Sequence, residues 1–134
     1  MKNVKYTLSP VVGGFFRVVA ARDFGGIKKG QVGGYVENEL SLSHDGSAWV
    51  SDDARVFGNA RVYGNAQLYG NAQVYGNAWV FGDAWVSDDA RVLGNAWVSG
   101  NAWVSGNARA YGNARVLGNA QVYGNAWVAG NVPV

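Results

Sequence analysis

The sequence of 134 residues has no cysteine, only two prolines and a single histidine. Without cysteine the chain can form neither a disulfide nor a thiolate metal site. It has no run that approaches the roughly 18 uninterrupted apolar residues of a membrane helix, and its first ten residues lead into no apolar segment of secretory length. We therefore predict a soluble protein that is not secreted by a signal peptide and has no membrane partner.

Charge of either sign is scarce, at 15% of residues. All lysines and glutamates lie in residues 1–47, whereas five arginines balance five aspartates in the remainder of the chain. The formal net charge of +2 therefore arises in the first 47 residues. A phosphate backbone selects a clustered basic surface, so we expect no nucleic acid partner.

Most of the chain is a hexapeptide repeat, Ala-x-Val-x-Gly-Asn, which runs unbroken from Ala48 to Val128. Alanine fills the first position in all 14 copies, and valine fills the third position in 12 of them. The alternation predicts short strands whose Ala and Val side chains face inward. The Gly-Asn pair predicts a turn, because both residues tolerate a positive φ. Such units fit a coil that stacks on itself rather than a ladder of hairpins.

Internal duplications indicate that three units form one coil. Residues 48–56 recur letter for letter at 84–92, a shift of 36, and residues 58–72 recur with two changes at 112–126, a shift of 54. Both shifts are multiples of 18, and duplication by whole coils keeps each residue in its own column. The sequence therefore predicts an all-β protein, a triangular parallel β-helix with three hexapeptides in each 18-residue coil. Its corner Asn residues are expected to form hydrogen-bonded ladders.

Several motifs resemble a known family. Residues 17–24 (Arg-Val-Val-Ala-Ala-Arg-Asp-Phe), 33–36 (Gly-Gly-Tyr-Val) and 42–46 (Leu-Ser-His-Asp-Gly) resemble the head of the YdcK-like proteins, and the hexapeptide run resembles a single-stranded left-handed β-helix. The resemblance implies a left-handed coil and a bacterial or prophage origin, hence a location in the cytoplasm or the phage particle. It brings no established activity and no catalytic residues.

Residues 1–47 are predicted to form a small N-terminal β cap, and residues 48–134 the β-helix. The first coil of a solenoid exposes strand edges and an apolar cross-section, which a cap covers. Docking of this head onto a partner is the alternative. Residues 40–42 are predicted to begin the coil one register early, before the segment 44–46 shifts it.

The period of three hexapeptides assigns the residue after each alanine to one of three outer faces. The first face holds Arg55, Gln73, Arg91, Arg109 and Trp127, the second Arg61, Trp79, Trp97 and Arg115, and the third Trp49, Gln67, Trp85, Trp103 and Gln121. We expect Trp79 to stack on Trp97, and Trp85 on Trp103, in an aromatic band larger than a soluble monomer usually exposes. The band either stiffens the coil or forms an association surface, and both can hold. Stacking of sugars or bases on the Trp faces is the third alternative. The arginines of the first face leave weak anion binding as an alternative.

Hexapeptide β-helices also resemble acyltransferases and γ-class carbonic anhydrases. The latter need three His ligands, and this chain has only His44. Acyltransferases of this fold rely on a catalytic His, usually with an extruded loop, and the repeat here has no insertion. His44 could act as a base, but its place between head and coil favours a structural hydrogen bond. The pairs Asp52-Asp53 and Asp88-Asp89 are predicted to be solvated turns, and we expect no metal, no cofactor and no catalytic residue.

The sequence therefore predicts a non-enzymatic structural or protein-interaction module that associates with itself, or with another protein, through its Trp-bearing faces. The predicted anchors are Trp79, Trp85, Trp97 and Trp103, with Phe81 beside them and Arg61 and Arg115 at the rim. The runner-up is an acyltransferase-like enzyme that uses His44. A phage protein that binds a host factor is the third possibility.

Overall fold

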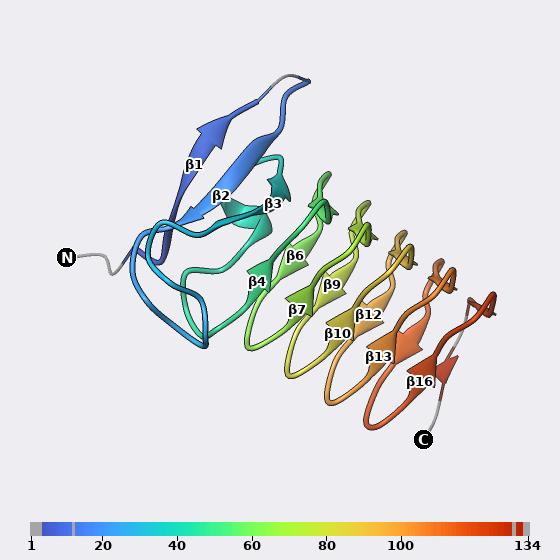
Figure 1. Ribbon diagram of the computed structural model, residues 1–134. Helices are drawn as coiled ribbons and strands as arrows, with labels where there is room; N and C mark the ends of the chain where they lie inside the picture. The colour runs from blue at the N-terminus through green and yellow to red at the C-terminus, as the bar shows by residue number, and fades with distance from the viewer. Residues whose placement is uncertain (1–3, 12, 130, 133–134) are drawn as a thin grey trace.

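The computed structural model describes residues 4–11, 13–129 and 131–132, and Figure 1 shows a head of longer strands at one end of a regular coil. The head contains β1 (Tyr6–Pro10), β2 (Phe16–Ala20) and β3 (Val32–Val36), followed by the short 3-10 helix η1 (Glu39–Ser41). The coil strands are all short: β4 (Trp49–Val50), β5 (Arg55–Val56), β6 (Arg61–Val62), β7 (Gln67–Leu68), β8 (Gln73–Val74), β9 (Trp79–Val80), β10 (Trp85–Val86), β11 (Arg91–Val92), β12 (Trp97–Val98), β13 (Trp103–Val104), β14 (Arg109–Ala110), β15 (Arg115–Val116), β16 (Gln121–Val122), β17 (Trp127–Val128) and β18 (Asn131–Val132). In the part of the chain so described, no helix is long and apolar enough to cross a membrane.

The coil strands form three parallel sheets, one along each side of a prism. One sheet contains β5, β8, β11, β14 and β17, the second β4, β7, β10, β13 and β16, and the third β6, β9, β12, β15 and β18. Paired residues lie one coil apart in sequence, as Trp79 does from Trp97 and Trp85 does from Trp103. The predicted all-β parallel coil, with three hexapeptides in each turn, is thus confirmed. The left-handedness of the coil stays a prediction.

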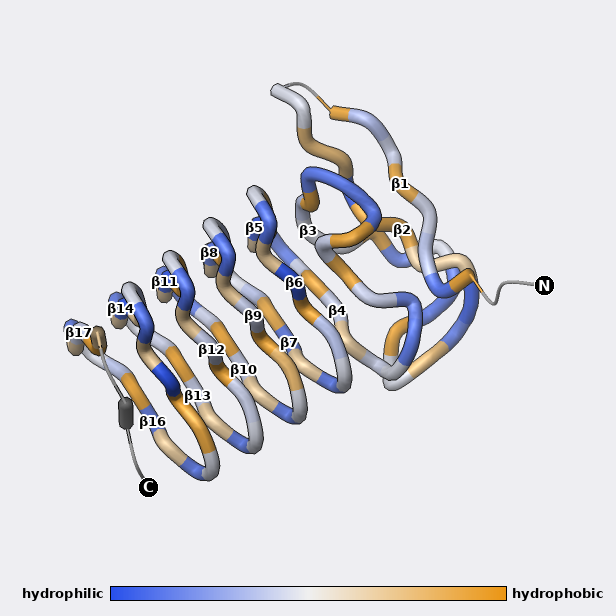
Figure 2. Tube along the Cα trace, turned by 180° about the vertical axis from the view of Figure 1, so that it is seen from behind, coloured by the Kyte–Doolittle hydropathy of each residue, from blue (hydrophilic) through white to orange (hydrophobic). Residues whose placement is uncertain are grey.

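The core of the prism is a set of stacked alanines and valines. The repeat alanines from Ala48 to Ala120 are buried, and so are the third-position residues from Val50 to Val122. Each buried valine contributes roughly 1.5–3 kcal/mol of gross apolar burial, which the entropy of ordering the backbone largely offsets. Figure 2 shows the hydrophilic corners as blue bends that line up from one coil to the next.

Hydrogen bonds along the axis hold each coil to its neighbour. The backbone N–H of Arg55, for example, donates to the carbonyl oxygen of Ala72 at 2.9 Å. At the corners the side-chain amide of Asn77 donates to Asn95 at 3.3 Å, and that of Asn95 donates to Asn113 at 3.4 Å. The predicted Asn ladders are therefore present, and they extend the order of the backbone to the corner side chains.

The head continues one sheet of the coil. Strand β3 pairs antiparallel with β2 but parallel with β5, where Tyr35 lies opposite Arg55 and Val36 opposite Val56. One sheet of eight strands therefore runs from head to coil in the order β1, β2, β3, β5, β8, β11, β14, β17, with β1 at its edge. This sheet contains strands from both sides of residue 47. The domain boundary predicted at that residue therefore stays a prediction.

A register shift separates the first coil from the others. Val36 lies opposite Val56, and Leu42 opposite Val62, so residue numbers differ by 20 in both pairs. Val50 lies opposite Leu68, where the difference is only 18, the regular coil length. The segment between Leu42 and Val50 must therefore be longer than the corresponding segment between Val62 and Leu68 of the next coil. This agrees with the predicted shift at residues 44–46, and it places a wider corner next to the head.

Trp49 is the clear departure from the expected surface. Its column is one of the outward columns, yet only 1% of its surface is exposed, because the head folds over it. The ring of Phe24 meets the indole edge to face at 5.4 Å. Trp49 is therefore part of the joint between head and coil rather than of any outer surface.

Candidate interaction surface

The three sides of the prism differ in charge, and we name them by that difference. The arginine face carries Arg55, Gln73, Arg91, Arg109 and Trp127. The Trp–Arg face carries Arg61, Trp79, Trp97 and Arg115. The uncharged face carries Trp49, Gln67, Trp85, Trp103 and Gln121. All three outward columns therefore match those predicted from the repeat period.

On the Trp–Arg face the indoles of Trp79 and Trp97 stack with centroids 5.3 Å apart and planes 2° from parallel. The Arg115 guanidinium lies 4.3 Å from the Trp97 centroid, on the ring face away from Trp79. It also donates to the backbone carbonyls of Asn95 and Asn113 at 3.1 and 3.0 Å. Arg115 is thus a cap on the aromatic stack, which is a more specific place than the rim predicted for it.

Phe81 belongs to the second outward column of the same face. Its ring stacks on that of Tyr63 at 4.9 Å and meets the edge of Trp97 at 6.1 Å. Tyr63 meets Trp79 in the same edgewise manner at 6.1 Å. The pKa of Tyr63 is raised by burial, against the opposing effect of the Arg61 charge. These contacts contribute ladder packing of the kind that stiffens a sheet.

On the uncharged face the indoles of Trp85 and Trp103 stack at 5.0 Å, with planes 3° from parallel. They remain 39% and 45% exposed. The neighbouring outward positions hold Ser87 and Ser105, which are too short to cover an indole. This pair therefore presents more open aromatic surface than the pair on the Trp–Arg face, whose members are half-buried.

The two stacked pairs lie on different sides of the prism. Trp79 and Trp97 belong to the sheet of β9 and β12, and Trp85 and Trp103 to the sheet of β10 and β13. The two sheets turn away from one another at the corner that contains Asp83. A flat partner can therefore cover one pair but not both, so the four indoles form two separate surfaces rather than one.

Acidic residues occupy the corners on both sides of the uncharged face: Asp83 lies at one corner, and Asp52, Asp53, Asp88 and Asp89 lie at the other. The side chain of Asp88 accepts a hydrogen bond from the backbone N–H of Gly106 at 3.1 Å, and that of Asp52 accepts one from Gly70 at 3.0 Å. Among the described residues no group of three or more His, Asp or Glu side chains could hold a metal ion. The first aspartate of each pair thus links its corner to the corresponding corner of the next coil.

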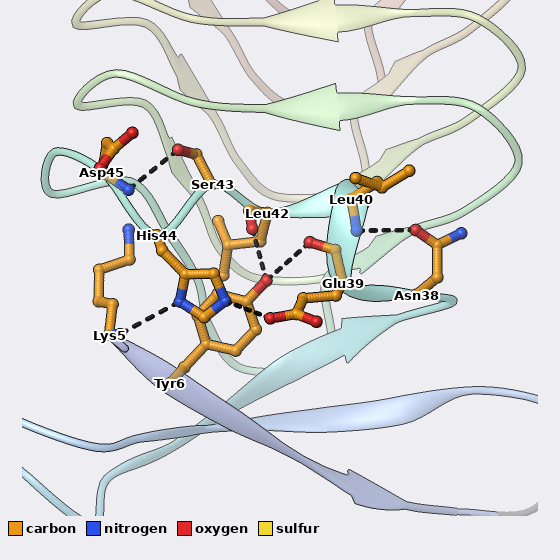
Figure 3. A network of polar contacts seen from close by, with 9 residues as sticks. All are labelled: Lys5, Tyr6, Asn38, Glu39, Leu40, Leu42, Ser43, His44 and Asp45. Carbon is orange, nitrogen blue, oxygen red and sulfur yellow. Dashed lines mark hydrogen bonds and ion pairs between the residues drawn. The ribbon is translucent and has the colours of Figure 1, made fainter. Parts of the chain in front are cut away.

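The single histidine lies where the head meets the coil, and Figure 3 shows its partners. Its Nδ1 accepts the backbone N–H of Lys5 at 3.1 Å, and its Nε2 lies 2.7 Å from a carboxylate oxygen of Glu39. Because Nδ1 accepts, the ring proton resides on Nε2 and is donated to Glu39. The ring also stacks on Tyr6 at 4.1 Å. Both ring nitrogens of His44 therefore take part in structural hydrogen bonds.

Two buried polar side chains beside His44, Lys5 and Tyr6, form hydrogen bonds that hold the N-terminal strand in place. The Lys5 side chain is fully buried, and its Nζ donates to the Ala48 carbonyl oxygen at 2.7 Å. Burial lowers the pKa of the Lys5 ammonium to about 8, and the positive charge of Arg22 acts in the same direction. The hydroxyl of Tyr6 donates to the carbonyl oxygen of Leu42, and burial raises its pKa.

A hollow of about 780 Å³ opens between this joint and the Trp–Arg face. Its walls are formed by Asn38, Glu39, Leu40, Leu42, Ser43, His44, Asp45, Arg61, Val62, Tyr63 and Trp79. The structure thus brings two predicted surface residues, Arg61 and Trp79, together with His44. The sequence reasoning missed Glu39 as a neighbour of these groups, although the wide corner at residues 44–46 was a signal that the surface departs from a regular prism there.

The repeats of the coil match those of a known family. The YdcK beta solenoid repeat matches residues 48–64, 54–70, 66–80, 72–88, 84–100 and 120–134. No curated protein gave a significant match. The matched segments begin at the repeat alanines and together cover residues 48–100 and 120–134. Because these repeats match the family and the fold is a parallel β-solenoid, the chain belongs to the YdcK beta solenoid repeat family.

Proposed function

We propose that the protein is a rigid, non-catalytic interaction module that pairs with a second copy of itself through the uncharged face. The observation that carries this proposal is the stacked pair of Trp85 and Trp103, each about two-fifths exposed in the middle of one flat sheet. Aromatic side chains at the centre of a patch are the usual anchors of protein interfaces. Continuous backbone hydrogen bonds keep the sheet rigid, so little entropy is lost when it binds.

The charge pattern favours a second copy as the partner. The outward strand positions of the uncharged face hold only Trp, Gln, Ser and Tyr, whereas the other two faces carry arginines. Two copies of an uncharged sheet can approach without bringing like charges together at the centre. An isologous pair of this kind is the commonest arrangement of soluble oligomers.

The other predicted residues are given supporting roles in this proposal. Trp79 and Trp97 are half-buried, and Arg115 covers the outer ring face of the latter. Phe81 packs against Tyr63. We therefore assign these side chains to the stability of the coil rather than to the interface between copies.

The test is the solution mass of the protein measured by light scattering over a range of concentrations. We expect the mass of the wild type to rise toward that of a dimer, and the variant Trp85→Ser/Trp103→Ser to remain a monomer. Trp127→Ser is the matched control, because Trp127 is 65% exposed on the arginine face. Circular dichroism of each variant verifies that the coil is folded.

Ionic strength provides a second readout of the same proposal. Pairing of two uncharged faces brings the acidic corners at Asp83 and Asp88 of the two copies closer, and added salt screens their repulsion. Association is therefore expected to strengthen with salt. A wild type that stays monomeric throughout, a double variant that associates like the wild type, or association that weakens with salt would overturn the proposal.

The acyltransferase alternative receives less support. A general base needs an available nitrogen within reach of the substrate, and both nitrogens of His44 are engaged with Lys5 and Glu39. Calorimetry with acetyl-CoA is the direct check, and we expect no heat of binding. Saturable binding that is lost in His44→Ala would favour the enzyme instead.

A further inference from the structure

We propose that the hollow between the head and the Trp–Arg face binds the end of a short neutral saccharide, with one sugar ring stacked on Trp79. This site is distinct from the uncharged face, and the inference does not depend on self-association. It rests on four features of the hollow: its size, an indole face of Trp79 on which no ring of the described residues stacks, the mixture of polar groups in its walls and the groove that lies beside it.

The hollow has the dimensions of a small-molecule site. Its volume of about 780 Å³ falls within the roughly 300–1,000 Å³ typical of ligand pockets. The segment from η1 to Asp45 forms one wall and the coil residues Arg61, Tyr63 and Trp79 form the other. The wall that contains His44 is held in place by hydrogen bonds to Lys5 and Glu39. The site is therefore formed before any ligand arrives.

The ring of Trp79 provides a stacking platform. One face of the Trp79–Trp97 stack is covered by the guanidinium of Arg115, at 4.3 Å from the Trp97 centroid. At the opposite end, no ring or guanidinium of the described residues stacks on the face of Trp79 that is turned toward Arg61. Tyr63 touches Trp79 only edgewise, with the ring planes 76° apart. The C–H face of a pyranose ring is flat and apolar, so it can pack on such a platform.

The polar groups around this platform suit hydroxyls better than an anion. Glu39 and Asp45 contribute two carboxylates, and Arg61 contributes one guanidinium. Within the described chain, the side chains of Asp45 and Arg61 have no hydrogen-bond partner, and one oxygen of Glu39 is paired with His44. A sugar hydroxyl can donate to a carboxylate and accept from a guanidinium. A carboxylate or phosphate ligand would be repelled by the two acids.

A shallow groove lies beside the hollow and runs along the coil. It is lined by the Asn ladder and by the Trp–Arg column: Asn59, Asn77, Asn95, Asn113, Arg61, Trp79, Trp97 and Arg115. Arg61 and Trp79 line both spaces, so the groove lies directly beside the hollow. The amides of the ladder donate and accept hydrogen bonds at regular intervals. This arrangement favours a linear chain of a few sugars over a single one.

The experiment is a titration of the full-length, isotope-labelled protein, followed by the NMR signals of the indole N–H groups. Maltotriose, mannotriose and N,N′,N″-triacetylchitotriose are the neutral probes, and glucuronic acid and inorganic phosphate are the anionic ones. We expect at least one neutral trisaccharide, at millimolar concentration, to shift the Trp79 signal in a saturable manner while the Trp127 signal stays in place. The anions are expected to give no shift.

Two variants make the result specific. Glu39→Gln keeps the size of an exposed side chain and removes one carboxylate, so we expect the affinity for the sugar to fall about tenfold, the loss of one charge-assisted hydrogen bond. Trp85→Ser/Trp103→Ser is expected to bind the sugar like the wild type, which separates this site from the proposed self-association. The inference is overturned if none of the three trisaccharides shifts Trp79, if only an anion does, or if Glu39→Gln binds unchanged.

Discussion

At the scale of single residues, the corner positions show how the repeat tolerates exceptions. Most corners place glycine at a positive φ, but Asp52 and Asp88 adopt φ values of 57° and 59° there. An L residue in this region costs roughly 1–2 kcal/mol. The carboxylate of Asp88 offsets part of that cost, because it accepts the N–H of Gly106 in the next coil.

A substitution series at Asp88 tests this explanation. Asp88→Ala keeps the strained φ and removes the hydrogen bond, so the free energy of unfolding should fall by about 1–2 kcal/mol. Asp88→Gly relieves the strain and should be close to neutral, and Asp88→Asn should retain most of the stability, since Asn tolerates this conformation. Urea denaturation followed by circular dichroism measures all three. Equal stability of the Ala and Gly variants would show that the backbone strain does not matter here, and an Ala variant as stable as the wild type would show that the hydrogen bond does not.

At the scale of elements, β3 is the strand that converts an antiparallel head into a parallel coil. It can do so because it lies directly against the first coil at two glycines. A Cβ atom on Gly33 would come within 2.3 Å of the Val50 carbonyl oxygen and 2.7 Å of the indole of Trp49. Gly33 thus has a steric role, since its φ does not require glycine.

We therefore expect Gly33→Ala to destabilise the protein by about 1–3 kcal/mol through overpacking. The matched control is Val32→Ala, one residue earlier in β3, where the valine is 54% exposed and the change should stay within about 0.5 kcal/mol. Thermal unfolding compares the two variants with the wild type. A Gly33→Ala variant as stable as Val32→Ala would mean that the head does not pack this closely on the coil.

At the scale of the whole molecule, the joint of head and coil links stability to pH. Burial depresses the pKa of Lys5 from 10.5 to about 8. Below pH 8 the lysine is charged in both the folded and the unfolded chain, so the penalty for burying the charge is complete. Between about pH 8 and 10.5 the folded chain has released the proton while the unfolded chain still holds it. The free energy of unfolding therefore rises with pH in this window.

Tyr6 acts in the opposite direction at higher pH. Burial raises its pKa above the ordinary 10.0, so above pH 10 the unfolded chain loses a proton that the folded chain keeps, and stability falls. We expect the free energy of unfolding to increase by on the order of 2 kcal/mol from pH 8 to 10, and then to decline. Denaturant titrations across this range measure it. The increase should vanish in Lys5→Met and persist in Lys29→Met, whose lysine is exposed.

The period of the sequence was sufficient to predict which residues share a column. A hexapeptide strand and its turn are local structures, and each coil is the template for the next, so an offset of three repeat units relates every pair such as Trp85 and Trp103. The same argument predicted the Asn ladders and the register shift near residue 44. These features follow from the spacing of residues and need no knowledge of how distant segments pack.

The sequence by itself thus determined the coil, its inward Ala and Val columns and the faces to which the tryptophans belong. Only the tertiary structure decided which of those side chains are covered. Trp49 is buried because the head folds over it, Trp79 faces a hollow because η1 lies across from it, and His44 is held by Lys5 and Glu39. The physical reason is that these contacts join residues of the head to residues of the coil, and a head without a repeat has no period from which its position can be read.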